Sequence, residues 1–212
     1  MIEKLSKGHN RFLDGYFKQN RARLEKLAQQ QTPEIAMVSC CDSRVDPTIL
    51  FDAEPGDIFI IRNVANLVPP FETKGDYHGT SAALEFAVRY LKVKQLVVLG
   101  HARCGGIRAL MENDKPVQSV ESDGFINSWM QLAAAAKQEV LAREDLHSQD
   151  ERIHACEKTA VKYSLQNLLT YPWIRQRVAE GKLELVGFYY NLYSGELDDI
   201  ELINAAQLSI TD

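Results

Sequence analysis

The sequence contains few cysteines for its length. Four Cys stand among 212 residues, too few for the disulfide framework that holds small secreted domains together. Long apolar runs are also missing, so the sequence predicts no membrane-spanning helix and no membrane partner. The first residues, Met1–Lys4, mix charges and predict no signal peptide. These absences favour a reducing compartment, and we expect a cytoplasmic protein.

Basic runs are missing as well. The net charge is −5, from 24 Lys and Arg against 29 Asp and Glu. Proteins that bind nucleic acid or anionic membranes carry clustered positive charge, so the sequence argues against both partners. The remaining balance, 45% hydrophobic and 25% charged, is that of a globular protein long enough for one domain with a sizeable core.

Apolar runs alternate with amphipathic stretches along the chain. Strands that alternate with helices predict an α/β fold, in which a central mostly parallel β-sheet is flanked by helices. Apolar residues recur among charges near the start, which predicts that residues 1–30 form an amphipathic helical N-terminal arm. Residues 31–212 then form the single α/β domain. The predicted buried strands are Ile35–Val38, Ile58–Ile61, Gln95–Gly100 and Leu183–Tyr190.

Two of these predicted strands end in side chains that bind soft metals. Cys40 follows the first strand, and His101 and Cys104 follow the third. The carboxyl ends of parallel strands share one edge of the sheet, so the three side chains converge if the two strands are neighbours. Two thiolates and one imidazole form a zinc site, and three protein ligands leave a fourth position open for chemistry. The sequence therefore predicts a catalytic Zn²⁺ site in the α/β domain.

The two motifs together resemble those of the β-class carbonic anhydrases. Cys-x-Asp-Ser-Arg at 40–44 is followed by His-x-x-Cys-Gly-Gly at 101–106, and the resemblance is dense from about Gln31 to Leu110. The resemblance implies a zinc-dependent lyase, a carbonate dehydratase. In such an enzyme, zinc-bound hydroxide attacks carbon dioxide and gives bicarbonate and a proton in a reversible reaction.

Asp42 and Arg44 are the candidate catalytic residues beside the metal. Asp42 lies two residues after Cys40, so in an extended segment both side chains point to the same side, whereas Cys41 points away. The Asp42 carboxylate can accept a hydrogen bond from the attacking hydroxide, and Arg44 can hold that carboxylate in a bidentate pair. The alternative interpretation of Asp42 and Arg44 is a surface salt bridge.

The resemblance also implies a substrate pocket. Gln31 matches a family Gln that hydrogen-bonds the substrate, and the Gly105 backbone helps to position it. Phe59, Val64 and Phe86 are expected to line an apolar pocket for carbon dioxide, partly across a subunit interface, although the family often has Tyr at the position of Phe86. The alternatives are a surface loop for Gln31 and plain core packing for the apolar residues.

The resemblance implies further that the amphipathic arm reaches over a neighbouring subunit, and the alternative is that it covers the sheet of its own chain. We expect a homodimer or a homotetramer that acts on carbon dioxide and bicarbonate. Two alternative functions remain open from the sequence. The chain could hydrolyse another small heterocumulene such as carbon disulfide, or it could be a non-catalytic protein with a structural zinc. Asp42 and Arg44 argue against the second alternative, because a closed zinc site needs no such pair.

Some members of the family close the site by letting the Asp bind the metal, with bicarbonate held in a noncatalytic pocket of Trp, Arg and Tyr. Arg62 and Tyr190 match two of these positions, but Met37 stands where the Trp would be and has no indole N–H to donate. The resemblance therefore implies an open resting state at neutral pH, in which Arg44 holds Asp42. For Arg62 itself we expect a structural role at the strand ends.

Overall fold

The computed structural model describes residues 2–112 and 124–211, and its centre is a five-stranded sheet of order β2-β1-β3-β4-β5. β1 to β4 run parallel, and β5 is antiparallel to β4. The predicted central, mostly parallel sheet is confirmed. The strands are β1 (Ile35–Cys40), β2 (Ile58–Asn63), β3 (Gln95–His101), β4 (Glu184–Tyr190) and β5 (Leu197–Ile203).

The inner strands β1 and β3 are buried along almost their whole length. Burial on both faces explains why their sequences are continuous apolar runs instead of alternating ones. Successive residues still point to opposite faces. Ala36 and Val38 belong to the core with Leu165 and Ile174 on the helical face, whereas Met37 belongs to a separate core on the other face.

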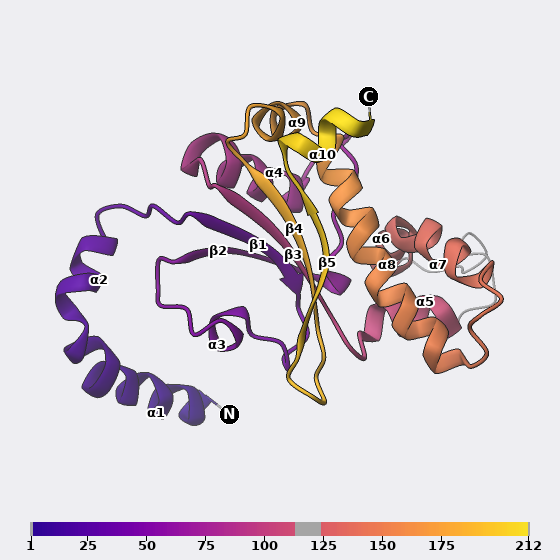
Figure 1. Ribbon diagram of the computed structural model, residues 1–212. Helices are drawn as coiled ribbons and strands as arrows, with labels where there is room; N and C mark the ends of the chain where they lie inside the picture. Colours follow the sequence, from indigo (N-terminus) through magenta and orange to yellow (C-terminus); the bar gives the residue numbers. More distant parts are fainter. Residues whose placement is uncertain (1, 113–123, 212) are drawn as a thin grey trace.

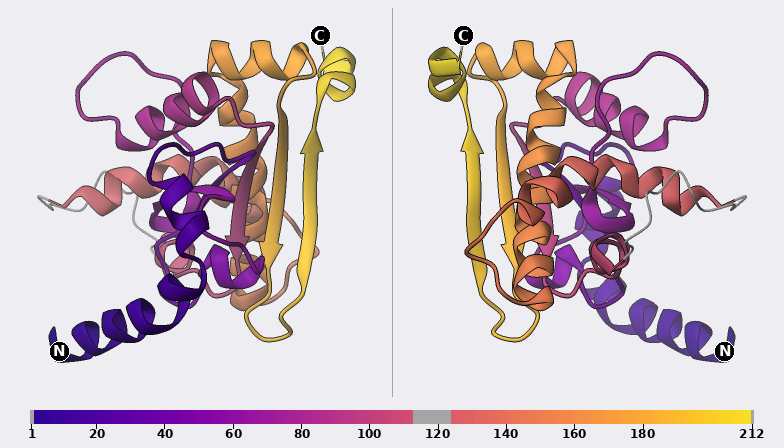
Figure 2. Two further views of the ribbon diagram at one scale, coloured as in Figure 1. Left: turned by 90° about the vertical axis from the view of Figure 1, so that its left-hand side faces the viewer. Right: turned by 90° about the vertical axis from the view of Figure 1, so that its right-hand side faces the viewer.

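Helices cover the sheet and surround its carboxyl edge (Figures 1 and 2). The longest, α8, packs on β3 and β4. It begins with a capping box, in which Ser148 Oγ accepts from Glu151 N–H at 3.2 Å and the Glu151 carboxylate accepts from Ser148 N–H at 2.8 Å. The α-helices after the arm are α3 (Pro47–Leu50), α4 (Gly79–Glu85), α5 (Gly105–Glu112), α6 (Phe125–Met130), α7 (Ala134–Leu141), α8 (Gln149–Leu169), α9 (Pro172–Ala179) and α10 (Ala205–Thr211).

The N-terminal segment projects away from the rest of the molecule (Figure 1). It consists of α1 (Ile2–Phe12), a π-helical turn (Leu13–Phe17) and α2 (Arg21–Leu27), so the arm is helical but divided into shorter segments. None of its described residues is buried, and Ile2 is 81% exposed. The segment thus presents apolar side chains that the described part of this chain does not cover.

Across residues 2–112 and 124–211, no helix combines the length and the apolar character that crossing a bilayer requires.

Candidate metal centre

The centre forms where β1 and β3 end side by side. The two strands pair from Ile35 opposite Gln95 to Ser39 opposite Leu99, so Cys40 and His101 leave the sheet at the same edge. Cys104 lies three residues later, directly before α5. The ligand atoms of Cys40, His101 and Cys104 all lie within 4.8 Å of one another, and the three residues are buried. The predicted convergence is confirmed.

The His101 imidazole is oriented as a metal ligand. Its Nδ1 lies 2.9 Å from the carbonyl oxygen of Ala102, so Nδ1–H donates there and Nε2 keeps its lone pair. Nε2 is buried and has no hydrogen-bond partner among the described residues. A buried polar atom without a partner costs about 1–3 kcal/mol, and a cation between Nε2 and the two thiols removes that cost. The donor set and this atom therefore fit zinc.

The Cys40 and Cys104 thiols lie close enough to affect each other's ionisation. A hydrogen bond with Cys104 lowers the pKa of the Cys40 thiol, and the same bond together with burial raises the pKa of the Cys104 thiol. Two buried sulfurs in contact cannot both carry a charge when nothing lies between them. A divalent cation between the two sulfurs would stabilise both thiolates.

A strained loop after β2 supports the Cys40 sulfur. Ala65 and Asn66 have left-handed φ values of 62° and 48°, conformations that cost about 1–3 kcal/mol each in residues other than glycine. Asn63 holds the loop, since its Oδ1 accepts from Leu67 N–H at 2.9 Å. The Ala65 N–H then donates to Cys40 Sγ at 3.3 Å. This contact has no sequence signal, because every residue except proline carries a backbone N–H.

Asp42 and Arg44 form the expected bidentate pair. Arg44 Nε donates to Asp42 Oδ1 at 2.9 Å and Arg44 Nη2 donates to Oδ2 at 2.7 Å. Hydrogen bonding from Arg44 holds the pKa of Asp42 well below its usual range. Arg44 Nη2 also donates to the carbonyl of Arg103 at 3.0 Å. Arg44 thereby joins the loop after β1 to the loop after β3, in the arrangement expected of the open state.

Arg62 ties the end of β1 to the loop that follows it. Its Nε donates to the Cys40 carbonyl at 2.9 Å, and its Nη2 donates to the carbonyls of Asp42 and Val45 at 2.8 and 2.7 Å. This is the structural role at the strand ends that the sequence predicts for Arg62. Because these donors already bind backbone carbonyls, Arg62 helps to fix the position from which Asp42 projects.

Two of the predicted substrate residues lie at the carboxyl edge. Val64, 36% exposed, lines an open hollow of about 760 Å³ together with Cys41 and Trp129. Gly105 begins α5, and no described atom lies within 4 Å of the place where its Cβ would be. Gly106, in contrast, is tightly packed, since a Cβ there would lie 3.1 Å from Val64 and from Met130. Of the two glycines, only Gly105 has a backbone that the side chains of described residues do not cover.

The other three predicted substrate residues lie elsewhere. Gln31 is exposed and precedes β1, so the six-residue strand separates it from Cys40, a span of roughly 17–20 Å. Phe59 pairs in register with Ala36, near the start of β1, and its ring packs against Phe86 at 5.8 Å between centroids. Within one chain, the structure does not bring these residues to the metal centre.

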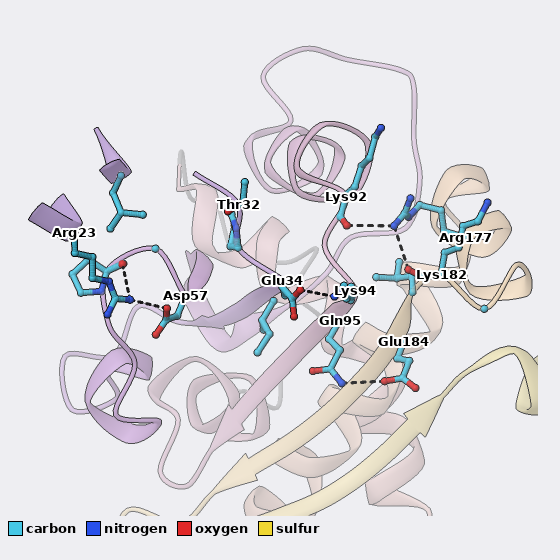
Figure 3. Close-up of a pocket in the computed structure, with 17 residues that line it drawn as sticks. Arg23, Thr32, Glu34, Asp57, Lys92, Lys94, Gln95, Arg177, Lys182 and Glu184 are labelled. Carbon is cyan, nitrogen blue, oxygen red and sulfur yellow. Dashed lines mark hydrogen bonds and ion pairs between the residues drawn. The ribbon is translucent and has the colours of Figure 1, made fainter. Parts of the chain in front are cut away.

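A large cavity lies at the opposite, amino edge of the sheet (Figure 3). It has a volume of about 1080 Å³. Its charged groups include the 2.9 Å ion pair between Arg23 and Asp57 and the pair between Lys94 and Glu34. None of the three metal-ligand residues lines it. Cavity size alone therefore does not indicate the functional site of this chain.

Sequence reasoning missed a buried carboxylate behind the centre. Glu157 of α8 is 4% exposed and accepts a hydrogen bond from the backbone N–H of Cys104 at 2.9 Å. The sequence does carry a signal for Glu157. It lies four residues after Ile153 and four before Val161, on the buried face of the helix, where an apolar residue is expected.

An α/β sheet that gathers two thiols and one imidazole beside an Arg-held carboxylate defines a class of zinc enzyme. Comparison with known proteins identifies the family. A family model described as carbonic anhydrase matches residues 35–197. Beta carbonic anhydrase 3 of Arabidopsis thaliana is 37% identical over 202 residues, which cover 95% of this chain and 77% of the relative. Beta carbonic anhydrase 5, chloroplastic, of the same plant is 43% identical over 168 residues, which cover 79% of this chain and 54% of the relative.

Solved structures agree with the sequence relatives. The β-carbonic anhydrase CcaA is 30% identical with a TM-score of 0.86, over 96% of this chain and 94% of that chain. A structure of tetrameric β-carbonic anhydrases from Sordaria macrospora is 30% identical with a TM-score of 0.79, over 94% of this chain and 96% of that chain. The chain belongs to the β-carbonic anhydrase family. It is a zinc-dependent lyase for the reversible hydration of carbon dioxide.

Proposed function

We propose that this carbonic anhydrase holds its zinc with Cys40, His101 and Cys104 and that Asp42 and Arg44 carry out the catalytic support. The observation that carries the proposal is the buried Nε2 of His101, which faces two thiols and has no other partner among the described residues. Zinc, when bound, is a Lewis acid that lowers the pKa of a coordinated water and so supplies a nucleophile near neutral pH.

The chain's own residues orient that nucleophile. With both carboxylate oxygens held by Arg44, Asp42 stays ionised and can only accept hydrogen bonds. Asp42 would therefore accept a hydrogen bond from the O–H of the nucleophile. That bond would leave a lone pair of the nucleophile pointing toward carbon dioxide. Val64 provides an apolar wall for an apolar substrate, and the open backbone at Gly105 leaves room beside it. An N–H at the start of α5 favours the negative charge that develops on bicarbonate.

We further propose that the N-terminal arm (residues 1–30) and the residues around Gln31 serve a second subunit, while residues 31–212 form the catalytic domain. The uncovered apolar residues of the arm support this, because a partner surface would bury them. Gln31, Phe59 and Phe86 lie away from the centre of their own chain, so as substrate residues they must act in a neighbour's site. The relative from Sordaria macrospora is described as tetrameric, and we propose a homodimer or a homotetramer.

We also propose a cytoplasmic location. All four cysteines are unpaired, and thiolates that bind metal require reducing surroundings. Recovery of the mature protein from an oxidising compartment in cell fractionation would contradict this.

Removal of the metal tests the proposed function directly. Stopped-flow measurement of carbon dioxide hydration should show activity in the zinc-loaded protein, background rates after treatment with a chelator, and recovery when zinc is added back. A parallel assay with carbon disulfide as the substrate tests the alternative function, hydrolysis of another small heterocumulene. A zinc-loaded protein that turns over carbon disulfide but not carbon dioxide would overturn the proposal.

Mixed oligomers test where Gln31 acts. Gln31→Leu should lower activity, and so should Cys104→Ser, when each variant is assembled alone. Mixed oligomers of the two should regain activity above that of either parent, because an intact metal centre then receives Gln31 from the other subunit. The reason is geometric, since roughly 17–20 Å of strand separates Gln31 from its own Cys40.

Two observations would contradict this arrangement. The first is a mixed oligomer no more active than the parents, although sedimentation shows that the subunits have exchanged. The second is full activity in a species that sediments at the single-chain mass of 23.9 kDa. Gln138→Leu is the matched control, because Gln138 is an exposed residue of α7, outside the arm and the residues around Gln31, and its replacement should leave activity unchanged.

A further inference from the structure

Glu157 is a buried carboxylate for which the proposed chemistry has no direct use. It lies on α8, against the loop that joins β3 to α5. Both of its oxygens are hydrogen-bonded: Oε1 accepts from the backbone N–H of Cys104 at 2.9 Å, and Oε2 accepts from the Tyr189 hydroxyl at 2.7 Å. Taking a carboxylate out of water is unfavourable unless such bonds compensate it. The Glu157 carboxylate therefore links α8, the loop before α5 and β4 at one point behind Cys104.

The loop that Glu157 contacts is strained. Arg103, between the two metal-ligand residues His101 and Cys104, has a left-handed φ of 59°, which costs about 1–3 kcal/mol in a non-glycine residue. This turn directs the Cys104 N–H into the protein instead of toward solvent. An acceptor at that point offsets the strain, and Glu157 provides it. On the other side of the loop, Arg44 binds the Arg103 carbonyl at 3.0 Å.

Glu157 is itself held in place. Tyr189, fully buried in β4, also has its hydroxyl 2.8 Å from His154 Nδ1, one turn before Glu157 on α8. Lys158 lies over the Tyr189 ring at 4.9 Å and forms an ion pair with Asp198 of β5 at 2.7 Å. The carboxylate thus has little freedom to move, as a group that positions another residue requires.

We propose that Glu157 is a positioning residue for the metal centre. By fixing the backbone N–H of Cys104, it sets the place at which the Cys104 sulfur meets His101 and Cys40. The proposal rests on the proposed function, because it takes Cys104 to be a zinc ligand. Its natural alternative is a role in stability alone, as any buried hydrogen bond between α8 and a loop would have.

Metal affinity separates the two roles. Glu157→Ala removes the acceptor and leaves the Cys104 N–H unpaired, and zinc should then dissociate about 10–100-fold more readily, the usual cost of removing a group that orients a ligand. Glu157→Gln keeps an oxygen that accepts from Cys104, and Tyr189 can turn its proton toward His154. Its zinc affinity should therefore stay within about threefold of the parent, a smaller change than the 10–100-fold range expected for Glu157→Ala.

The measurement is a competition titration of zinc against a chromophoric chelator, on the full chain. Cobalt(II) in place of zinc supplies a second readout, since its thiolate absorption bands should shift in Glu157→Ala and not in Glu157→Gln. Ser164→Ala is the matched control. Ser164 is a buried residue of the same helix whose hydroxyl accepts from Val68 N–H at 3.3 Å, so this variant should lose stability without losing zinc affinity.

A folded Glu157→Ala protein with the parent's zinc affinity and cobalt spectrum would overturn the proposal. If that variant does not fold, Tyr189→Phe carries the test. It removes only the hydroxyl that holds Oε2, and it should weaken zinc binding by about tenfold, the lower end of the 10–100-fold range. Unchanged affinity in Tyr189→Phe would overturn the proposal equally. A parent protein that binds zinc but does not hydrate carbon dioxide would defeat the proposed function and leave this inference standing.

Discussion

Cys104→Ser should lose its zinc and its carbon dioxide hydration together. A serine hydroxyl is a poor substitute for a thiolate, because it stays protonated near neutral pH and is a harder ligand. Replacing groups that only orient a ligand costs about 10–100-fold in metal affinity, so loss of a ligand itself should cost more than about 100-fold. Metal analysis after dialysis should find less than one zinc per chain, and stopped-flow assays should find rates near background.

Cys41→Ser is the matched control for this variant. Cys41 is exposed and lies outside the group of three ligand residues, although it is adjacent to Cys40 in the sequence. The Cys41→Ser variant should keep one zinc per chain. Full zinc and full activity in Cys104→Ser would remove Cys104 from the site, and loss of zinc in Cys41→Ser would show that the wrong one of the two neighbouring cysteines had been assigned.

Asp42→Asn should keep its zinc and lose most of its activity. The amide retains the size of the carboxylate, but it has only one acceptor oxygen and cannot form the bidentate pair with Arg44. Its NH₂ group would donate hydrogen bonds where the nucleophile needs an acceptor. Groups that handle a proton in the reaction contribute about 10²–10⁴-fold, so kcat/KM should fall by about 10²-fold or more.

Asp46→Asn is the control for the Asp42 variant. Asp46 lies four residues away and caps α3, where its Oδ1 accepts from Thr48 N–H at 2.9 Å. Asparagine caps helices about as well as aspartate, so both stability and kcat/KM should be retained. The assignment of Asp42 would be wrong if Asp42→Asn, fully loaded with zinc, kept the parent's kcat/KM.

The sequence by itself predicted the candidate ligand set, which the structure brings together, and the pair beside it. Cys40, Asp42 and Arg44 lie within five consecutive residues, and local geometry alone puts Asp42 next to Arg44. The strands were predictable for a similar reason, since a strand buried on both faces requires a continuous apolar run. These features depend on residue chemistry and short spacing, which are present in any single sequence.

Only the tertiary structure decided which strands are neighbours. The pairing of β1 with β3 brings His101 to Cys40 across about 60 residues of chain, and packing of the whole sheet selects it. The same holds for Ala65 and Glu157, whose contacts with the two ligand cysteines come from other elements. The resemblance implied a substrate role for Gln31, yet the length and direction of β1 put it at the far edge of the sheet in its own chain. Spacing along the chain does not encode these contacts, because they depend on strand order and on how helices and loops pack around the sheet.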